Sequence, residues 1–172
     1  MNYEELNKAW KTQREQYLLW ERRLMHHAQE VCDHFEEKLR LPQASWTTYD
    51  GTEERPYVEL VDLSDRSKPK RGAPSNKSIT DEGTLVFGIG IIFDHGPDSH
   101  PKRSISIPIA VRYNKMNPEY AVHSFEGDQP AESWVQDMDT LYSNATKKLH
   151  EYLSHDPHNG FAKQERAIGF IG

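Results

Sequence analysis

Two stretches near the middle of the chain carry large apolar residues with a period of two. Every second residue is apolar along residues 84–93, and residues 104–113 repeat the pattern. A period of two places alternate side chains on the same side of a β-sheet. The intervening segment 94–103 is rich in Gly, Pro and Asp, which favour turns. The pattern therefore predicts two antiparallel strands joined as a hairpin.

The first forty residues follow a different period. Apolar and aromatic side chains recur there at alternating steps of three and four residues, and no Gly or Pro occurs before Pro42. This spacing predicts one amphipathic helix over residues 3–40. The helix would be roughly 55 Å long, whereas a domain of this size has a radius of gyration of about 15 Å. We therefore expect part of the helix to extend beyond the core.

Shorter patterns predict the remaining elements. Apolar residues within 57–63 and 119–125 indicate two further strands, and 46–49 can add a short one, so the sheet would span residues 46–126. A second amphipathic pattern predicts a helix over 130–154, with Pro130 in its first turn.

The tail, residues 155–172, ends in three apolar residues that can dock as a short final strand: Ile168, Phe170 and Ile171. The whole chain, 1–172, is expected to form a single α+β domain. Strands that follow one another through short connections predict an antiparallel sheet of four to five strands, with both helices packed on one sheet face. Two glycines within the first central strand, Gly88 and Gly90, leave a bare patch that we expect a tryptophan of the long helix to cover.

Composition limits the partners. The chain has 172 residues and a net charge of -6, so it lacks the globally positive field that attracts nucleic acid. Its single cysteine, Cys32, cannot form an internal disulfide, and no run of 18 apolar residues indicates a membrane span. The first residues lack the basic and apolar regions of a secretory signal. We therefore expect a cytoplasmic protein with no membrane contact.

One segment departs from the acidic balance. Residues 64–80 are rich in Pro, Ser and Gly and lack apolar periodicity, which predicts a mobile loop. Within 66–77 the segment holds five basic residues and no acidic one: Arg66, Lys68, Lys70, Arg71 and Lys77. Two interpretations stay open, namely a solvated loop, or a basic arm that binds phosphates or an acidic protein surface.

Candidate chemistry is sparse. The turns 94–100 and 150–158 are rich in His and Asp, which can ligate metal, yet turn preference and helix termination explain both. The sequence lacks a nucleophile elbow, a phosphate-binding loop and a Cys-x-x-Cys pair. We therefore predict no metal, no cofactor and no catalytic residue. A small enzyme with a site between sheet and helices is the third functional hypothesis.

The leading hypothesis rests on the aromatic residues of the long helix. The helix could simply pack along the sheet, or its overhanging turns could bury their aromatic side chains against a second chain, as interface cores commonly do. The residues concerned are Tyr3, Trp10, Tyr17 and Trp20. The second interpretation predicts a non-enzymatic interaction module, such as an adaptor, inhibitor or chaperone-like factor, that binds a partner or itself. The alternative is a nucleic-acid-associated factor that uses the basic segment 66–77.

Overall fold

The computed structural model describes residues 1–96, 98–124, 133–154 and 169–171, the last three by their backbone alone. An uninterrupted helix, α1 (Tyr3–Lys38), opens the chain. Asn2 and Glu5 form a reciprocal capping box at its start, which satisfies two amide groups that a helix end leaves without partners. The prediction of one long helix is confirmed.

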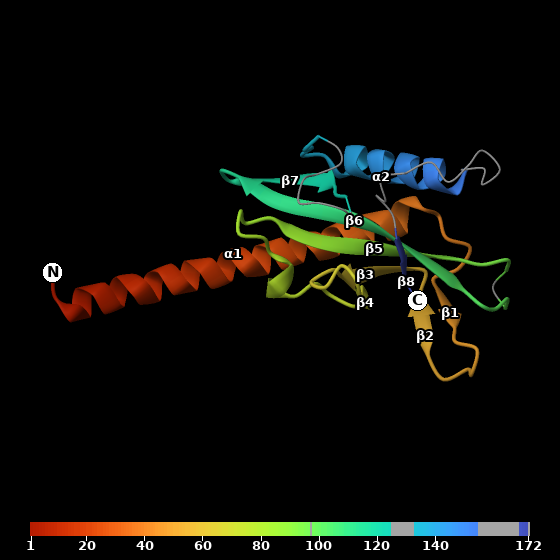
Figure 1. Cartoon of the computed structure of the whole chain (residues 1–172), viewed down its shortest axis with the longest axis horizontal. Helices are drawn as coiled ribbons and strands as arrows, with labels where there is room; N and C mark the ends of the chain where they lie inside the picture. Colours follow the sequence, from red (N-terminus) through yellow and green to blue (C-terminus); the bar gives the residue numbers. More distant parts are fainter. Residues whose placement is uncertain (97, 125–132, 155–168, 172) are drawn as a thin grey trace.

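The main sheet is antiparallel, as predicted. Its strands are β3 (Val58–Asp62), β4 (Lys70–Arg71), β5 (Leu85–Phe93), β6 (Arg103–Asn114) and β7 (Asn117–Val122). They run in the order β4-β3-β5-β6-β7, and β8 (Gly169–Ile171) pairs with β6 (Figure 1). The β5–β6 hairpin is its longest pairing, from Leu85 opposite Val111 to Phe93 opposite Arg103. The predicted final strand is present at 169–171, while Ile168 lies outside the described residues.

A separate two-stranded sheet follows the long helix. It consists of β1 (Ser45–Thr47) and β2 (Glu54–Pro56), which are antiparallel. The short strand predicted at 46–49 is present as β1, but the prediction that it belongs to the main sheet is wrong, because it pairs with β2 in this separate sheet. The polar composition of β2 gives no apolar period to recognise, because its three residues are exposed or half-buried.

The second helix, α2 (Met138–Leu153), begins later than expected. Its N-cap is Asp137, whose side chain accepts a hydrogen bond from the Thr140 amide. The predicted start at Pro130 lies outside the described residues, but the prediction is wrong for 133–137. Val135 instead exchanges two backbone hydrogen bonds with Tyr120 of β7, so sheet pairing replaces helix over this stretch.

Both helices cover the same face of the sheet, as predicted. The inward side chains of α1 (residues 24–35) and α2 join one apolar cluster with the alternate residues of the strands. On the sheet these include Leu85, Phe87, Ile89, Ile107, Ile109 and Val111. A smaller cluster of Val61, Leu63, Val86 and Ala110 lies on the opposite face, with Trp134 packed against it.

The prediction that a tryptophan of α1 covers Gly88 and Gly90 is wrong. Gly88 and Gly90 lie on the face away from α1, and a Cβ there would meet Val61 of β3 and the hydroxyls of Ser104 and Ser106. Neighbouring strands therefore need the space, and no tryptophan of α1 covers the patch. The helix packs on the Phe87 and Ile89 face because that face carries the apolar side chains.

The segment 64–80 also departs from the expectation of a loop without elements of its own. It contains β4 and a single 3-10 turn at Asn76–Ser78. The Gly72 amide donates to the Leu60 carbonyl (2.9 Å), and the Ser78 hydroxyl donates to Asp62 (2.9 Å). These hydrogen bonds tie the segment to β3. The mobility of the segment between these points stays a prediction, which amide hydrogen exchange in the monomer would measure.

Candidate functional site

An aromatic stripe runs along the N-terminal half of α1. We define it as the positions that recur at steps of three and four residues before the sheet begins: Tyr3, Leu6, Trp10, Gln13, Tyr17 and Trp20. Tyr3, Trp10 and Tyr17 are exposed over 79%, 54% and 55% of their surface. Figure 1 shows why, since this half of α1 projects well past the sheet. The structure thus leaves three of the four predicted aromatic residues open to solvent.

Local contacts order these side chains. The Arg14 guanidinium lies over the Trp10 ring, 5.6 Å from its centroid. The rings of Tyr17 and Trp20 are 5.1 Å apart and tilted against each other. Cation–π and aromatic pairs of this kind restrict rotamers. The stripe is therefore partly preorganised, which lowers the entropy lost on binding.

Trp20 marks the boundary between the exposed stripe and the core. It is half-buried and packs against the large apolar cluster. Its ring lies 3.3 Å from where a Cβ on Gly83 would be, and Gly83 has φ +78°, which favours glycine. From Leu24 onwards the same helix face is fully buried beneath the sheet. The stripe is therefore the continuation of the core-facing side of α1 beyond the end of the sheet.

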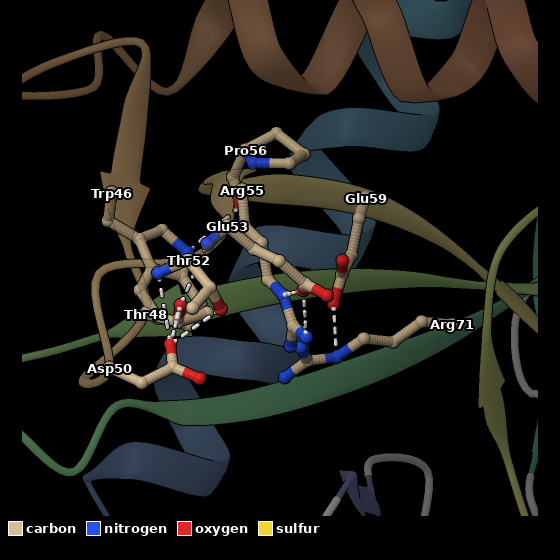
Figure 2. Close-up of polar contacts among 9 residues, drawn as sticks. All are labelled: Trp46, Thr48, Asp50, Thr52, Glu53, Arg55, Pro56, Glu59 and Arg71. Carbon is tan, nitrogen blue, oxygen red and sulfur yellow. Dashed lines mark hydrogen bonds and ion pairs between the residues drawn. The ribbon is translucent and has the colours of Figure 1, made fainter.

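The basic segment is only partly available for binding. Lys68, Lys70 and Lys77 are exposed. Arg71 Nε lies 3.0 Å from Glu59 Oε1 on the adjacent strand (Figure 2). Burial raises the pKa of Glu59, and nearby Arg55 acts in the opposite direction. Arg71 therefore already has an intramolecular counter-ion, so it is a weaker candidate for phosphate contact than the three lysines.

A polar network that sequence analysis missed joins α1 to the sheet. His27 Nδ1 lies 2.7 Å from Glu30 Oε2, and His27 Nε2 lies 2.8 Å from the Tyr113 hydroxyl. The Tyr120 hydroxyl is 3.3 Å from the same Nδ1. Burial, and then the Glu30 charge, raise the pKa of Tyr120 to about 12. The phenols therefore stay neutral, and the network acts as a polar clamp that holds α1 on β6 and β7.

A second missed cluster lies where the β1–β2 and β5–β6 hairpins meet. Lys102 Nζ is nearly buried, lies 2.6 Å from Asp94 Oδ2, and stands 5.7 Å from the centre of the Trp46 ring. The hydrogen bond from Lys102 lowers the pKa of Asp94, and the Tyr57 hydroxyl donates to the same oxygen (2.9 Å). Asp94, one of the residues of the turn 94–100 that can ligate metal, therefore serves as the counter-ion of Lys102.

An open pocket of about 480 Å³ adjoins this cluster and is lined by Trp46, Thr48, Tyr49, His100, Pro101 and Lys102. Figure 2 shows the turn beside it, where the Trp46 indole donates to the Pro56 carbonyl (3.2 Å). Hydrogen bonds from Thr48 and Thr52 lower the pKa of Asp50 to about 2. These contacts fix the hairpin geometry. Within the described residues, no three His, Cys, Asp or Glu side chains converge as a metal site would require.

Comparison with known protein families, with curated proteins and with solved structures finds no match to this chain. No helix in the described ranges is both long and apolar enough to cross a membrane. The function has to be inferred from the surfaces themselves. Of these, the aromatic stripe combines the largest exposed apolar side chains with a rigid backbone.

Proposed function

We propose that this chain is a protein-interaction module that binds through the aromatic stripe of α1. The observation that carries the proposal is the exposure of Tyr3, Trp10 and Tyr17 on the face that is buried further along the helix. Contiguous exposed apolar patches mark interaction sites, and aromatic residues are enriched in interface cores. Binding of another protein to the open apolar face of the helix would remove that surface from water.

The size of the stripe fits this role. Aromatic side chains bury about 150–250 Å² each, so the exposed parts of Tyr3, Trp10 and Tyr17 together with Leu6 present about 450 Å² of apolar surface. At about 25 cal/mol per Å², its burial would contribute on the order of 11 kcal/mol before the costs of association. Those costs are about 4–15 kcal/mol. The stripe can therefore carry most of a reversible interface.

The test captures partners on the full-length chain. Wild type and a Trp10→Ala/Tyr17→Ala variant are each immobilised through one tag. Each is then exposed to an extract of the cells that make the protein, to which soluble wild-type chain with a different tag has been added. We expect the variant to retain at least about tenfold less of its specific partner, because it lacks two anchor side chains. Bound proteins, including the tagged copy, are quantified by mass spectrometry.

The matched control changes the opposite side of the same helix. Lys8→Ala/Glu15→Ala removes one charge of each sign from residues that lie away from the stripe, and alanine favours helix. This control should bind like wild type. Equal binding by wild type and the Trp10→Ala/Tyr17→Ala variant, for every protein captured, would contradict the proposal.

The basic segment supports a second candidate function, which is contact with nucleic-acid phosphates. The exposed Lys68, Lys70 and Lys77 favour it. Such binding would be backbone-type and strongly salt-dependent. Titration of DNA and RNA at low salt tests it, with loss of binding expected for Lys68→Ala/Lys70→Ala/Lys77→Ala. A reducing compartment such as the cytoplasm suits either function, because the free Cys32 is buried and cannot pair internally.

A further inference from the structure

We infer that the partner of the aromatic stripe is a second copy of this chain, whose α1 lies antiparallel over residues 3–20. This inference rests on the proposed function and goes further, because it fixes the partner and its orientation. Closed two-fold pairing is the commonest form of self-association, and it requires a patch that is complementary to itself. The structure offers such a patch on the sheet-facing side of α1.

The continuity of the helix face excludes an in-register parallel pair. The stripe and the buried residues Leu24, Val31 and Phe35 lie on one side of a single straight element (Figure 1). In a parallel pair, the C-terminal half of the second α1 would occupy the space that this chain's own sheet fills. An antiparallel pair places the two sheets at opposite ends of the helix pair. Each projecting half then lies against the other.

The length of the open stripe sets the register. Leu24 is fully buried, so the overlap ends near Trp20, and the two-fold axis falls between positions 10 and 13. Tyr3 of one copy then lies opposite Trp20 of the other, over about 26 Å of helix. In the same register Leu6 faces Tyr17, and Trp10 faces Gln13. Every position of the stripe therefore meets another position of the stripe.

Gln13 gives this arrangement its orientation. It is the polar member of the stripe, and it falls at the centre of the antiparallel overlap. There its amide oxygen can accept a hydrogen bond from the Trp10 indole N–H of the other copy. A single polar residue in an otherwise apolar helix seam is a known determinant of register and orientation. In a parallel pair, Gln13 would face Gln13 and Trp10 would face Trp10.

Charges beside the stripe are complementary in the same orientation. Glu5 and Arg23 lie on the same flank of the helix, near opposite ends of the overlap, and both are exposed. Antiparallel packing brings Glu5 of one copy towards Arg23 of the other at both ends. Glu21, on the other flank, approaches the N-terminal end of the other helix, which carries partial positive charge. In a parallel pair, Glu5 of one copy and Arg23 of the other would lie about 27 Å apart along the helix axis, so they could not form an ion pair.

The buried area also suits a dimer. Two stripes contribute about 900 Å² of apolar surface, and interfaces are about 60% apolar, so the total is about 1,500 Å². Stable interfaces bury about 1,200–2,000 Å². The pair of stripes therefore reaches the range of a specific interface without any contribution from the sheets.

The first experiment measures mass and orientation on the full chain. Light scattering across a concentration series should show a dimer for wild type and a monomer for Trp10→Ala/Tyr17→Ala. A spin label on Arg22→Cys reports orientation by electron paramagnetic resonance. The two labels should be offset by about 32 Å along the helix axis if the pair is antiparallel, and by none if it is parallel. Cys32 is buried and does not take the label.

The second experiment reverses the flanking charges. Arg23→Glu and Glu5→Lys should each weaken the dimer at least about tenfold. The double variant should recover most of the loss, because each reversed charge then meets a reversed charge of opposite sign on the other copy. Glu5→Gln, which keeps an oxygen for the capping box, controls for helix stability, and circular dichroism checks helix content. In a parallel dimer the double variant would show no recovery.

The outcomes separate the two proposals. A wild type that is monomeric at every concentration overturns the second copy as partner, and the capture experiment then decides whether the stripe binds another protein. A dimer with no axial offset between the Arg22→Cys labels overturns the antiparallel arrangement alone. A dimer that persists in Trp10→Ala/Tyr17→Ala overturns the use of the stripe, and with it the inference. A stripe-dependent dimer with the long offset supports it.

Discussion

The two halves of α1 share one sequence pattern but have different surroundings. In the C-terminal half, Leu24, Ala28 and Phe35 are completely buried beneath the sheet. In the N-terminal half, Trp10 and Tyr17 occupy the equivalent face and remain more than half exposed. The helix itself does not change, since its hydrogen bonding runs unbroken from Tyr3 to Lys38.

The difference shows that periodicity defines a face without defining what covers it. The sheet ends beside Trp20, which packs over Gly83 just before β5 begins. Beyond that point the same amphipathic face has no cover within the described residues. Burial is a property of neighbouring elements, whereas amphipathicity is a property of the helix alone. A comparison of matched substitutions in the two halves can test this division.

The largest contrast is expected between Phe35→Ala and Trp10→Ala. Phe35 is fully buried and contacts the Tyr142 ring (centroids 5.1 Å apart), so its loss should lower the free energy of unfolding by about 3–5 kcal/mol. Trp10→Ala should change it by about 0.5 kcal/mol or less, as at other exposed sites. Urea denaturation at concentrations where light scattering shows a monomer measures both. Similar losses from the two substitutions would mean that the N-terminal half is covered within the monomer.

The reactivity of a cysteine thiol should also differ strongly between the two halves of α1. Cys32 is buried on the covered half of α1, and burial, followed by the charges of Asp33, Glu36 and Glu59, raises its pKa to about 12. A cysteine introduced at Thr12 on the exposed half should react with a disulfide reagent on the order of 10³ times faster at pH 8, since the thiolate is the reactive form.

The comparison uses Thr12→Cys in a Cys32→Ala background and the wild-type chain, with absorbance as the readout. In urea the two rates should converge, because unfolding exposes both thiols. A native rate for Cys32 close to that of the introduced cysteine would show that the C-terminal half of α1 opens readily.

A smaller effect is expected at the boundary. Trp20 is half-buried against the core and Gly83, so Trp20→Ala should destabilise the monomer by about 1–2 kcal/mol, less than full burial of an aromatic residue would imply. Tyr17→Ala, one turn earlier, should cost less than about 0.5 kcal/mol. Denaturation of the two variants side by side locates the point at which the core ends. Equal effects would move that boundary towards the N-terminus.

The smallest effect concerns the exposed link between α1 and α2. Asp139 lies 2.9 Å from both Lys38 Nζ and His34 Nε2, and the hydrogen bond from Lys38 lowers its pKa below the usual 3.8. A carboxylate with a lowered pKa in the folded state stabilises the protein above its usual pKa, and this contribution is lost as the pH falls through the lowered value.

Asp139→Asn should therefore destabilise the chain slightly at pH 6 and have no effect near pH 2. Thermal unfolding across this pH range provides the measurement. Glu15→Gln, on the exposed half of α1, serves as the control and should leave the profile unchanged. A wild-type and Asp139→Asn pair whose melting temperatures differ equally at pH 6 and pH 2 would exclude the link as the cause.

Much of the fold could be predicted from the sequence because the determining signals are local. The period of two in residues 84–93 and 104–113 fixed the central hairpin, and the steps of three and four fixed α1. The start of α2 was placed too early, because Pro130 suits the first turn of a helix and Trp134 continues the apolar spacing of the helix. Val135 pairs instead with Tyr120, and a partner fifteen residues away leaves no trace in the local pattern.

The candidate sites divide in the same way. Tyr3, Trp10 and Tyr17 were recognised as a stripe from spacing alone, whereas their exposure depends on where the sheet stops. The polar clamp joins His27 to Tyr113, which lies 86 positions later in the chain, and to Tyr120, which lies 93 positions later. No periodicity connects such residues, because their contact arises only when the helix lies across the strands.

The sequence by itself determined the helix, its amphipathic face, the antiparallel hairpin and the acidic net charge. Each of these depends on backbone preference and on side chains close together in the chain. The tertiary structure decided which half of α1 is covered, that Arg71 has Glu59 as a counter-ion, and that strands rather than a tryptophan fill the space beside Gly88. These outcomes depend on where distant segments meet, and packing in three dimensions sets that.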